Sequence, residues 1–187
     1  MKQLFITLLL VSTTVLYSQG KYELGYENLK WNMTGNQVKI VLATDTILSM
    51  KVRYRDGIIT KENGKLAEHT YQRIEAVVKR TDYQLTYSCI IIDNSLCEVS
   101  ILDLRNKEQK PLEYLTEKHR GLFSDESDIY PVDAQGWRTD ANVMIYLEGP
   151  PRTYNIKYVT FLRKDMKNVY DNVIHNLENN GSTGYGD

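Results

Sequence analysis

The strict alternation of side chains in residues 48–55 constrains the fold of this chain most. Leu48, Met50, Val52 and Tyr54 are apolar, and the residues between them are polar or cationic. A period of two places the two kinds of side chain on opposite faces of an extended strand. Strands with one solvated face are typical of antiparallel sheets. The segment therefore predicts an antiparallel sheet.

Turn signals divide the middle of the chain into further strands. Asp56-Gly57 and Asn63-Gly64 are dipeptides typical of tight turns between antiparallel strands. Two apolar runs, residues 83–92 and 96–104, predict the clearest hairpin in the chain.

Two segments fit more than one kind of element. Residues 68–80 fit a helix or a buried strand. Residues 36–43 fit a strand that pairs with residues 29–33, or a short helix that begins at a capping box of Thr34 and Gln37. The β-branched residues in this second segment favour the strand.

The last part of the chain predicts two helices and two more strands. Pro111 is suited to the first position of a helix over residues 111–122. Residues 143–147 and 154–161 have the pattern of strands. A helix over residues 165–178 is the strongest prediction, because its apolar residues form one stripe that we expect to dock on the sheet. The stripe consists of Met166, Val169, Tyr170, Val173, Ile174 and Leu177.

Together these patterns predict a single α+β domain over residues 19–179. We expect mainly antiparallel β structure, as a curved sheet or partly open barrel of about seven to nine strands. The C-terminal amphipathic helix packs on this sheet. Residues 180–187 are expected to form a disordered tail.

The first eighteen residues have the layout of a secretory signal peptide. Lys2 supplies the positive charge, residues 4–11 form the apolar region, and cleavage is expected after Ser18. The apolar region is shorter than the about 20 residues that a permanent membrane helix needs. We therefore expect a periplasmic or secreted protein, not inserted in a membrane after cleavage.

The charge balance argues against a nucleic-acid partner. The chain has 23 Lys and Arg against 24 Asp and Glu, and loss of Lys2 with the signal peptide leaves 22 against 24. Proteins that bind nucleic acids usually carry a basic excess or a basic stripe. The cationic residues within 51–55 alternate with apolar ones, and we interpret them as the solvent face of a strand.

An oxidising compartment permits a disulfide between Cys89 and Cys97. If residues 93–95 form a three-residue loop, Cys89 lies opposite Val99 and diagonal to Cys97, at about 7–8 Å between Cα atoms. That separation exceeds the usual disulfide span. A five-residue loop would place the two cysteines opposite each other, and a two-residue loop would place them on opposite faces. A disulfide and two buried thiols both remain open.

The sequence contains no recognisable catalytic or metal-binding motif. His69, His119 and His175 lack metal-ligand spacing, and we interpret them as polar surface residues. No serine lies in a Gly-x-Ser-x-Gly elbow. The acidic residues within 124–140 match no EF-hand spacing, and a solvated loop explains them. We therefore predict a protein that is not an enzyme and needs neither a cofactor nor a metal.

Aromatic residues are the remaining indication of function. The chain has 14 tyrosines and 2 tryptophans, and exposed aromatic side chains form platforms for sugars or protein partners. Trp137 lies in the loop expected over residues 124–140, and loops often carry binding residues. We predict Trp137, Tyr130 and Arg138 as binding residues, for a small apolar or sugar ligand or for a protein partner.

Tyr17-Ser18-Gln19, Leu29-Lys30-Trp31 and residues 35–42 together resemble small exported proteins of Bacteroidota that are lipocalin-like in outline. The likeness covers residues 26–66 and implies a β-rich fold without a known active site. The Gly-x-Trp motif of lipocalins is absent, because Leu29 and Lys30 precede Trp31.

Residues 31–38, and residues 112–123 followed by Trp137, resemble small periplasmic proteins with helix-then-sheet units. Some of those proteins inhibit enzymes or scaffold outer-membrane assembly, and this resemblance requires residues 36–43 to be helical. The leading hypothesis is a non-catalytic binding protein of the bacterial cell envelope. The alternative is an inhibitor or immunity-type protein that neutralises a secreted enzyme. A hydrolase, the third hypothesis, would need a cleft with convergent histidine and carboxylate or serine groups.

Overall fold

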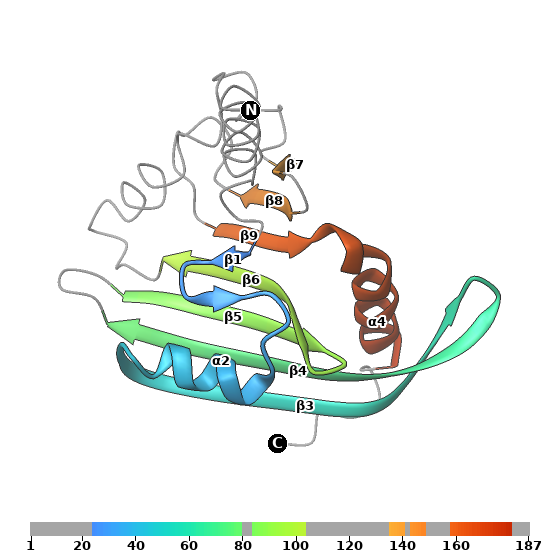
Figure 1. Cartoon of the computed structure of the whole chain (residues 1–187), viewed down its shortest axis with the longest axis horizontal. Coiled ribbons are helices and arrows are strands. Elements are labelled where there is room, and N and C mark those ends of the chain that lie inside the picture. Colours follow the sequence, from blue (N-terminus) through green and yellow to red (C-terminus); the bar gives the residue numbers. More distant parts are fainter. Residues whose placement is uncertain (1–23, 80–83, 104–134, 141–142, 149–157, 181–187) are drawn as a thin grey trace, which may run out of the picture.

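The computed structural model describes residues 24–79, 84–103, 135–140, 143–148 and 158–180. Seven of the described strands form one antiparallel sheet, in the order β3-β4-β5-β6-β9-β8-β7 (Figure 1). A separate two-stranded ribbon, β1 (Gly25–Tyr26) with β2 (Leu29–Lys30), lies over this sheet. The predicted α+β class with a curved antiparallel sheet is confirmed.

The strands of the large sheet differ greatly in length. The first four in the chain are β3 (Thr46–Glu62), β4 (Lys65–Lys79), β5 (Gln84–Ile92) and β6 (Ser95–Asp103). The last three are β7 (Gln135–Asp140), β8 (Val143–Glu148) and β9 (Tyr158–Arg163). The far end of the β3–β4 hairpin curls out of the sheet beyond the C-terminal helix (Figure 1).

Two α-helices accompany the sheet in the described residues, α2 (Gly35–Leu42) and α4 (Lys167–Asn180). A short 3₁₀ turn, η2 (Lys164–Met166), joins β9 to α4. Neither helix has the length and apolar composition that crossing a membrane would require. The expected signal peptide, the helix over 111–122 and residues 181–187 lie outside the described residues.

Helix α2 corrects the strand that we favoured for residues 36–43. The backbone N–H of Thr34 donates to Gln37 Oε1 at 2.8 Å, and the backbone N–H of Gln37 donates to Thr34 Oγ1 at 3.4 Å. This capping box satisfies donors that a helix start leaves free. Val38 and Leu42, four residues apart, are both buried against the sheet. End capping and a common buried face thus outweigh the β propensity of the segment.

Turn chemistry accounts for the two hairpins in the first half of the sheet. Asn63 and Gly64 have φ of 48° and 80° and join β3 to β4, as the sequence predicted. Residues 68–80 are resolved as a strand, since β4 covers nearly all of them. Asp93 and Asn94, with φ of 51° and 61°, form a two-residue turn between β5 and β6. Two successive residues with positive φ are typical of the tight hairpin turn that matches the twist of the strands.

Asp56-Gly57 does not form the turn that we expected. Strand β3 continues through it, and pairing with β4 passes from Arg55 opposite Tyr71 to Ile58 opposite His69. Two residues of β3 therefore face one residue of β4, which is a β-bulge. The φ of Gly57 is 63°, a conformation that a glycine adopts without strain in either a turn or a bulge.

The sheet carries an apolar core on both faces. The α2 face, which α2 and the β1–β2 ribbon cover, includes Tyr26, Val38, Ile74, Cys89, Val99 and Phe161. The opposite α4 face includes Ile58, Tyr71, Ile90, Ile92, Cys97 and Val173. The other five residues of the predicted apolar stripe pack on this second cluster. The prediction that the C-terminal helix docks on the sheet through this stripe is confirmed.

The two cysteines are free and lie on opposite faces of the sheet. Cys89 belongs to the core on the α2 face and Cys97 to the core on the α4 face. The turn has two residues, and a bulge at Cys97 follows it on β6. Because of this extra residue, Cys89 lies opposite Val99, the partner that a three-residue loop would also give. The Cys97 thiol donates to the carbonyl of Ile90 at 3.3 Å. Burial raises the pKa of both thiols, so neither is an activated nucleophile.

Candidate functional site

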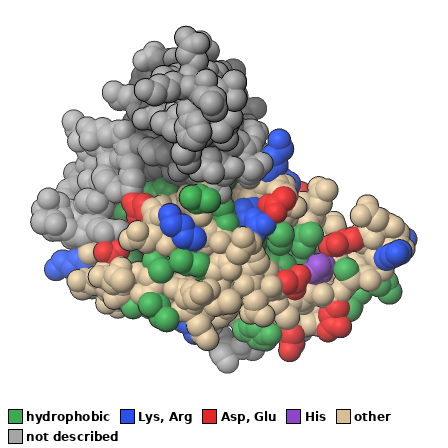
Figure 2. All heavy atoms as spheres, in the orientation of Figure 1, with side chains coloured by type: hydrophobic (Ala, Val, Ile, Leu, Met, Phe, Trp, Pro, Cys, Tyr) green, Lys and Arg blue, Asp and Glu red, His purple; other side chains and the backbone are tan. Residues whose placement is uncertain are grey.

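Strand β3 forms one edge of the sheet and is largely exposed. It has 17 residues, and β4 is its only partner among the described strands. Of the seven large hydrophobic side chains exposed in the described residues, four lie on β3: Leu48, Val52, Tyr54 and Ile59. Hydrophobic side chains reach the surface along the lower border of the molecule in Figure 2, where β3 runs in Figure 1. An exposed edge with apolar side chains is a template for another strand.

The two faces of β3 have different chemistry before the bulge. Val52 lies opposite the buried Ile74, so Val52 and its neighbour Tyr54 lie on the α2 face. They are 45% and 60% exposed, whereas Ile47 and Met50, earlier on the same strand, pack against the core of this face. Lys51, Arg53 and Arg55 lie on the α4 face and are exposed. The predicted solvent face of this strand is therefore confirmed.

The three cations of β3 have no carboxylate partner within the described residues. Lys51 lies opposite Glu75 on β4, but Glu75 Oε1 binds Arg73 Nη2 at 2.8 Å. Arg73 Nε also donates to Ser88 Oγ at 3.0 Å. Among the residues that the structure describes, no carboxylate lies within ion-pair distance of Lys51, Arg53 or Arg55. This part of the α4 face is therefore cationic.

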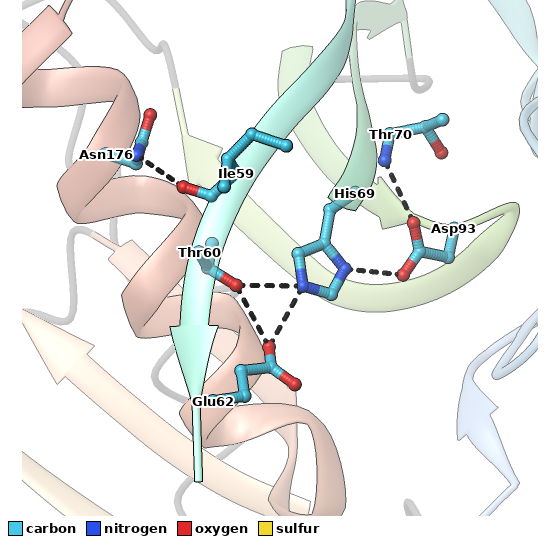
Figure 3. A network of polar contacts seen from close by, with 7 residues as sticks. All are labelled: Ile59, Thr60, Glu62, His69, Thr70, Asp93 and Asn176. Carbon is cyan, nitrogen blue, oxygen red and sulfur yellow. Dashed lines mark hydrogen bonds and ion pairs between the residues drawn. The ribbon is translucent and has the colours of Figure 1, made fainter. Parts of the chain in front are cut away.

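A buried histidine holds the part of β3 that follows the bulge (Figure 3). His69 is 6% exposed, which corrects its interpretation as a surface residue. Its Nδ1 lies 2.8 Å from Asp93 Oδ2 in the β5–β6 turn. Its Nε2 lies 2.9 Å from Glu62 Oε1 and 3.0 Å from Thr60 Oγ1, both on β3. The ring thus joins β4 to β3 through one nitrogen and to the β5–β6 turn through the other.

The two carboxylates favour the charged form of His69. Burial of the ring lowers its pKa, but the hydrogen bond and charge of Asp93 and the charge of Glu62 outweigh burial. The pKa of His69 is therefore raised above its usual value of 6.5. As an imidazolium, the ring donates from both nitrogens and satisfies an acceptor on each side.

Asp93, His69 and Thr60 follow the order of a carboxylate–histidine–hydroxyl triad. Their surroundings do not suit that chemistry. Glu62 Oε1 lies 2.9 Å from Nε2, so a carboxylate occupies the nitrogen that a general base would use to take a proton from Thr60. The Thr60 hydroxyl instead lies 3.3 Å from Glu62 Oε1, to which it donates, and Thr60 is only 5% exposed. We interpret the cluster as a structural clamp.

Further hydrogen bonds hold the same part of the β3–β4 hairpin, the part that follows the bulge. The Thr70 N–H donates to Asp93 Oδ1 at 2.9 Å, and the Asp93 N–H donates to the Thr70 carbonyl at 3.1 Å. On α4, Asn176 Nδ2 donates to the carbonyl of Ile59 at 2.9 Å (Figure 3). The β5–β6 turn and α4 thus hold the hairpin at the residues that follow the bulge, next to the exposed residues 51–55 of β3. Residues on such a fixed scaffold bind a partner with little loss of conformational entropy.

A second buried polar cluster lies beneath α4. Glu98 Oε1 accepts from Ser100 Oγ at 2.7 Å, and Ser100 Oγ lies 2.9 Å from Thr160 Oγ1. Burial raises the pKa of Glu98, although hydrogen bonds from Tyr170 on α4 and from Ser100 oppose this shift. Because Glu98 is only 4% exposed, we assign it no binding role. In the described ranges, no group of three His, Cys, Asp or Glu side chains is placed to hold a metal ion.

The binding residues predicted from the sequence do not lie at β3. Trp137 and Arg138 belong to β7, where they pair with Tyr146 and Ile145 of β8. The loop expected over residues 124–140 is thus wrong for residues 135–140, which form a strand because they have a partner in β8. In the described sheet β7 is the edge opposite β3. Tyr130 lies outside the described residues, and the three binding residues stay a prediction.

Searches of protein-family models, curated proteins and solved structures found no significant match to this chain. The resemblance to lipocalin-like exported proteins therefore stays a prediction. The helix that the second resemblance requires at residues 36–43 is present as α2.

No motif in the sequence predicted the clamp at His69. One signal was available, because a two-residue turn at Asn63-Gly64 fixes the register of β3 and β4. That register places Thr60 and Glu62 close to His69 along the hairpin. Asp93 lies 24 residues from His69, and only the completed sheet brings the two together.

Proposed function

We propose that this chain is an exported, non-catalytic binding protein of the bacterial cell envelope that binds through strand β3. The exposed apolar edge of β3 is the observation that carries this proposal. Full burial of one large apolar side chain is worth about 1.5–3 kcal/mol, so a partner that covers two of them gains substantial free energy. The clamp at His69 supports a binding role, because it holds the end of this edge in place.

The chemistry of the described polar clusters also supports binding over catalysis. The two nitrogens of His69 are engaged by carboxylates, and both cysteines are buried with raised pKa. A general base needs a free lone pair near the proton that it takes, and a thiol nucleophile needs a lowered pKa.

The test compares one edge variant with one matched control. Val52→Lys combined with Tyr54→Lys places two charges on the exposed α2 face of β3. Ile40→Lys changes a side chain that is 69% exposed on α2, away from the edge. The purified proteins are immobilised and exposed to envelope proteins of the source organism, after circular dichroism has verified that each is folded.

We expect a protein that the original chain and Ile40→Lys retain and that the edge variant loses. Retention by all three proteins, or by none, would contradict the proposal. An inhibitor or immunity-type role makes a narrower prediction. The retained protein would then be a single secreted enzyme whose activity falls on addition of one equivalent of this chain.

A further inference from the structure

We infer that the partner of β3 is an extended peptide segment in which acidic and apolar residues alternate. It adds to the seven-stranded sheet as one more strand, beside β3. This inference rests on the proposed binding function and specifies the chemistry of the partner. Three features of β3 support it: the length of its regular edge, the pattern of its two faces, and the like charges that a second copy of the chain would bring against it.

The usable edge is the regular part of β3 between two irregularities. Pairing with β4 shifts between Ile47 and Ser49 and again between Arg55 and Ile58, and it is continuous over residues 49–55. Beyond the second shift, the carbonyl of Ile59 is already bound by Asn176 of α4. A bulge twists the strand and interrupts regular pairing. An added strand can therefore pair regularly with residues 49–55 of β3.

The pattern of β3 determines the pattern of the added strand. Residues that lie directly opposite each other on neighbouring strands project to the same face of the sheet. On the α4 face, the partner meets the exposed cations Lys51, Arg53 and Arg55. On the α2 face it meets Val52 and Tyr54. Carboxylates at every second position, with apolar residues between them, complement both faces at once.

The neighbouring strand leaves these cations available to a partner. Glu75, the acidic residue opposite Lys51, is held by Arg73 at 2.8 Å. Arg73 lies opposite Arg53, and its charge is balanced by Glu75, so the three cations of β3 stay without a counter-charge from β4. An acidic strand would thus reduce an excess of positive charge that β4 does not neutralise.

A second copy of the chain does not fit this edge. The cations stand at odd-numbered positions, so an antiparallel edge-to-edge pairing that is centred within residues 51–55 and continues both faces of the sheet sets cation against cation. With Arg53 opposite Arg53 of the other copy, Lys51 lies opposite Arg55. Like charges directly opposite each other destabilise strand pairs, and charged side chains on an edge are a known safeguard against self-association.

The test uses synthetic peptides of eight residues with blocked ends. The first alternates glutamate with valine, the second alternates lysine with valine, and the third has the composition of the first in a non-alternating order. Binding to the purified protein is measured by fluorescence anisotropy of labelled peptides, at low and high salt. Hydrogen exchange of residues 49–55 reports whether the bound peptide adds to the strand.

We expect at least tenfold tighter binding of the alternating acidic peptide than of either control, and weaker binding at high salt. The double variant Arg53→Glu with Arg55→Glu should reverse the preference and bind the lysine peptide. Lys65→Glu, at an exposed position at the turn end of β4, is the matched control and should bind like the original chain. Protection from exchange should rise at residues 49–55.

Equal binding of the three peptides, or an unchanged preference in the charge-reversed variant, would overturn this inference. The proposed function has its own readout. If the charge-reversed variant keeps the envelope partner that Val52→Lys with Tyr54→Lys loses, the edge binds but the acidic chemistry is wrong. A concentration-dependent dimer in sedimentation experiments, lost in that same apolar-edge variant, would identify a second copy as the partner and overturn the inference.

Discussion

His69 is the single residue on which the geometry beyond the exposed edge most depends. Its folded-state pKa is raised by two carboxylates, so its contribution to stability is fully present below its unfolded pKa. That contribution is lost as the pH rises through the folded-state pKa. We expect His69→Gln, which cannot carry a charge, to cost about 1–3 kcal/mol at about pH 5.5 and less at about pH 8.5. Urea unfolding at the two pH values measures the difference.

The control for this residue is His175→Gln on α4. His175 is exposed and contacts only Asn179 in the hydrogen bonds of the described residues. We expect little change in the free energy of unfolding at either pH. A His69→Gln cost that is the same at both pH values, or equal to that of His175→Gln, would show that the charge of His69 does not stabilise the fold.

At the scale of the element, Gly57 allows β3 to change direction within one continuous strand. Its φ of 63° lies in the left-handed region, and a Cβ there would meet no atom closer than Glu68 Oε1 at 3.9 Å. The cost of Gly57→Ala is thus a backbone cost, which we expect to be about 1–2 kcal/mol in urea unfolding. Gly57→Asn should cost less, because asparagine tolerates this conformation. If Gly57→Ala left the free energy of unfolding unchanged, the role of the bulge would be contradicted.

Elements with a strong local signal could be predicted, and those decided by longer-range contacts could not. The stripe from Met166 to Leu177 was sufficient to predict the C-terminal helix, and Asn63-Gly64 was sufficient to predict the turn between β3 and β4. Helical periodicity and positive φ are local properties. Asp56-Gly57 suits a turn and a bulge equally well. Which of the two forms depends on whether β3 stays paired with β4 beyond this point. Helix α2 was one of two alternatives, and the strand was favoured because burial of Val38 and Leu42 against the sheet, which outweighs β propensity, is not a local property.

The candidate site likewise has one feature that local sequence predicts and others that depend on long-range contacts. Alternation within residues 51–55 was enough to predict a solvent-facing row of cations. It does not reveal that this strand is an edge, which depends on the order of all seven strands. The contact of His69 with Asp93 depends on the packing of a second hairpin against the first, and no local pattern encodes it.

At the scale of the whole molecule, the described sheet offers two separate edges. Strand β3 lies at one and β7, with Trp137 and Arg138, at the other. Seven strands place the two edges about 30 Å apart. One extended segment bound along β3 therefore does not reach β7, and any binding by Trp137 is a second, independent contact.

This separation makes a quantitative prediction for Trp137. If Trp137 is a binding residue, Trp137→Ala should weaken retention of an envelope partner, and this loss should add to that of Val52→Lys with Tyr54→Lys. Substitutions far apart without shared partners are additive within about 0.3–0.5 kcal/mol. A double-mutant cycle on the affinity for the retained partner measures the coupling. Unchanged affinity in Trp137→Ala would remove Trp137 from the binding surface, and strong coupling would contradict two independent edges.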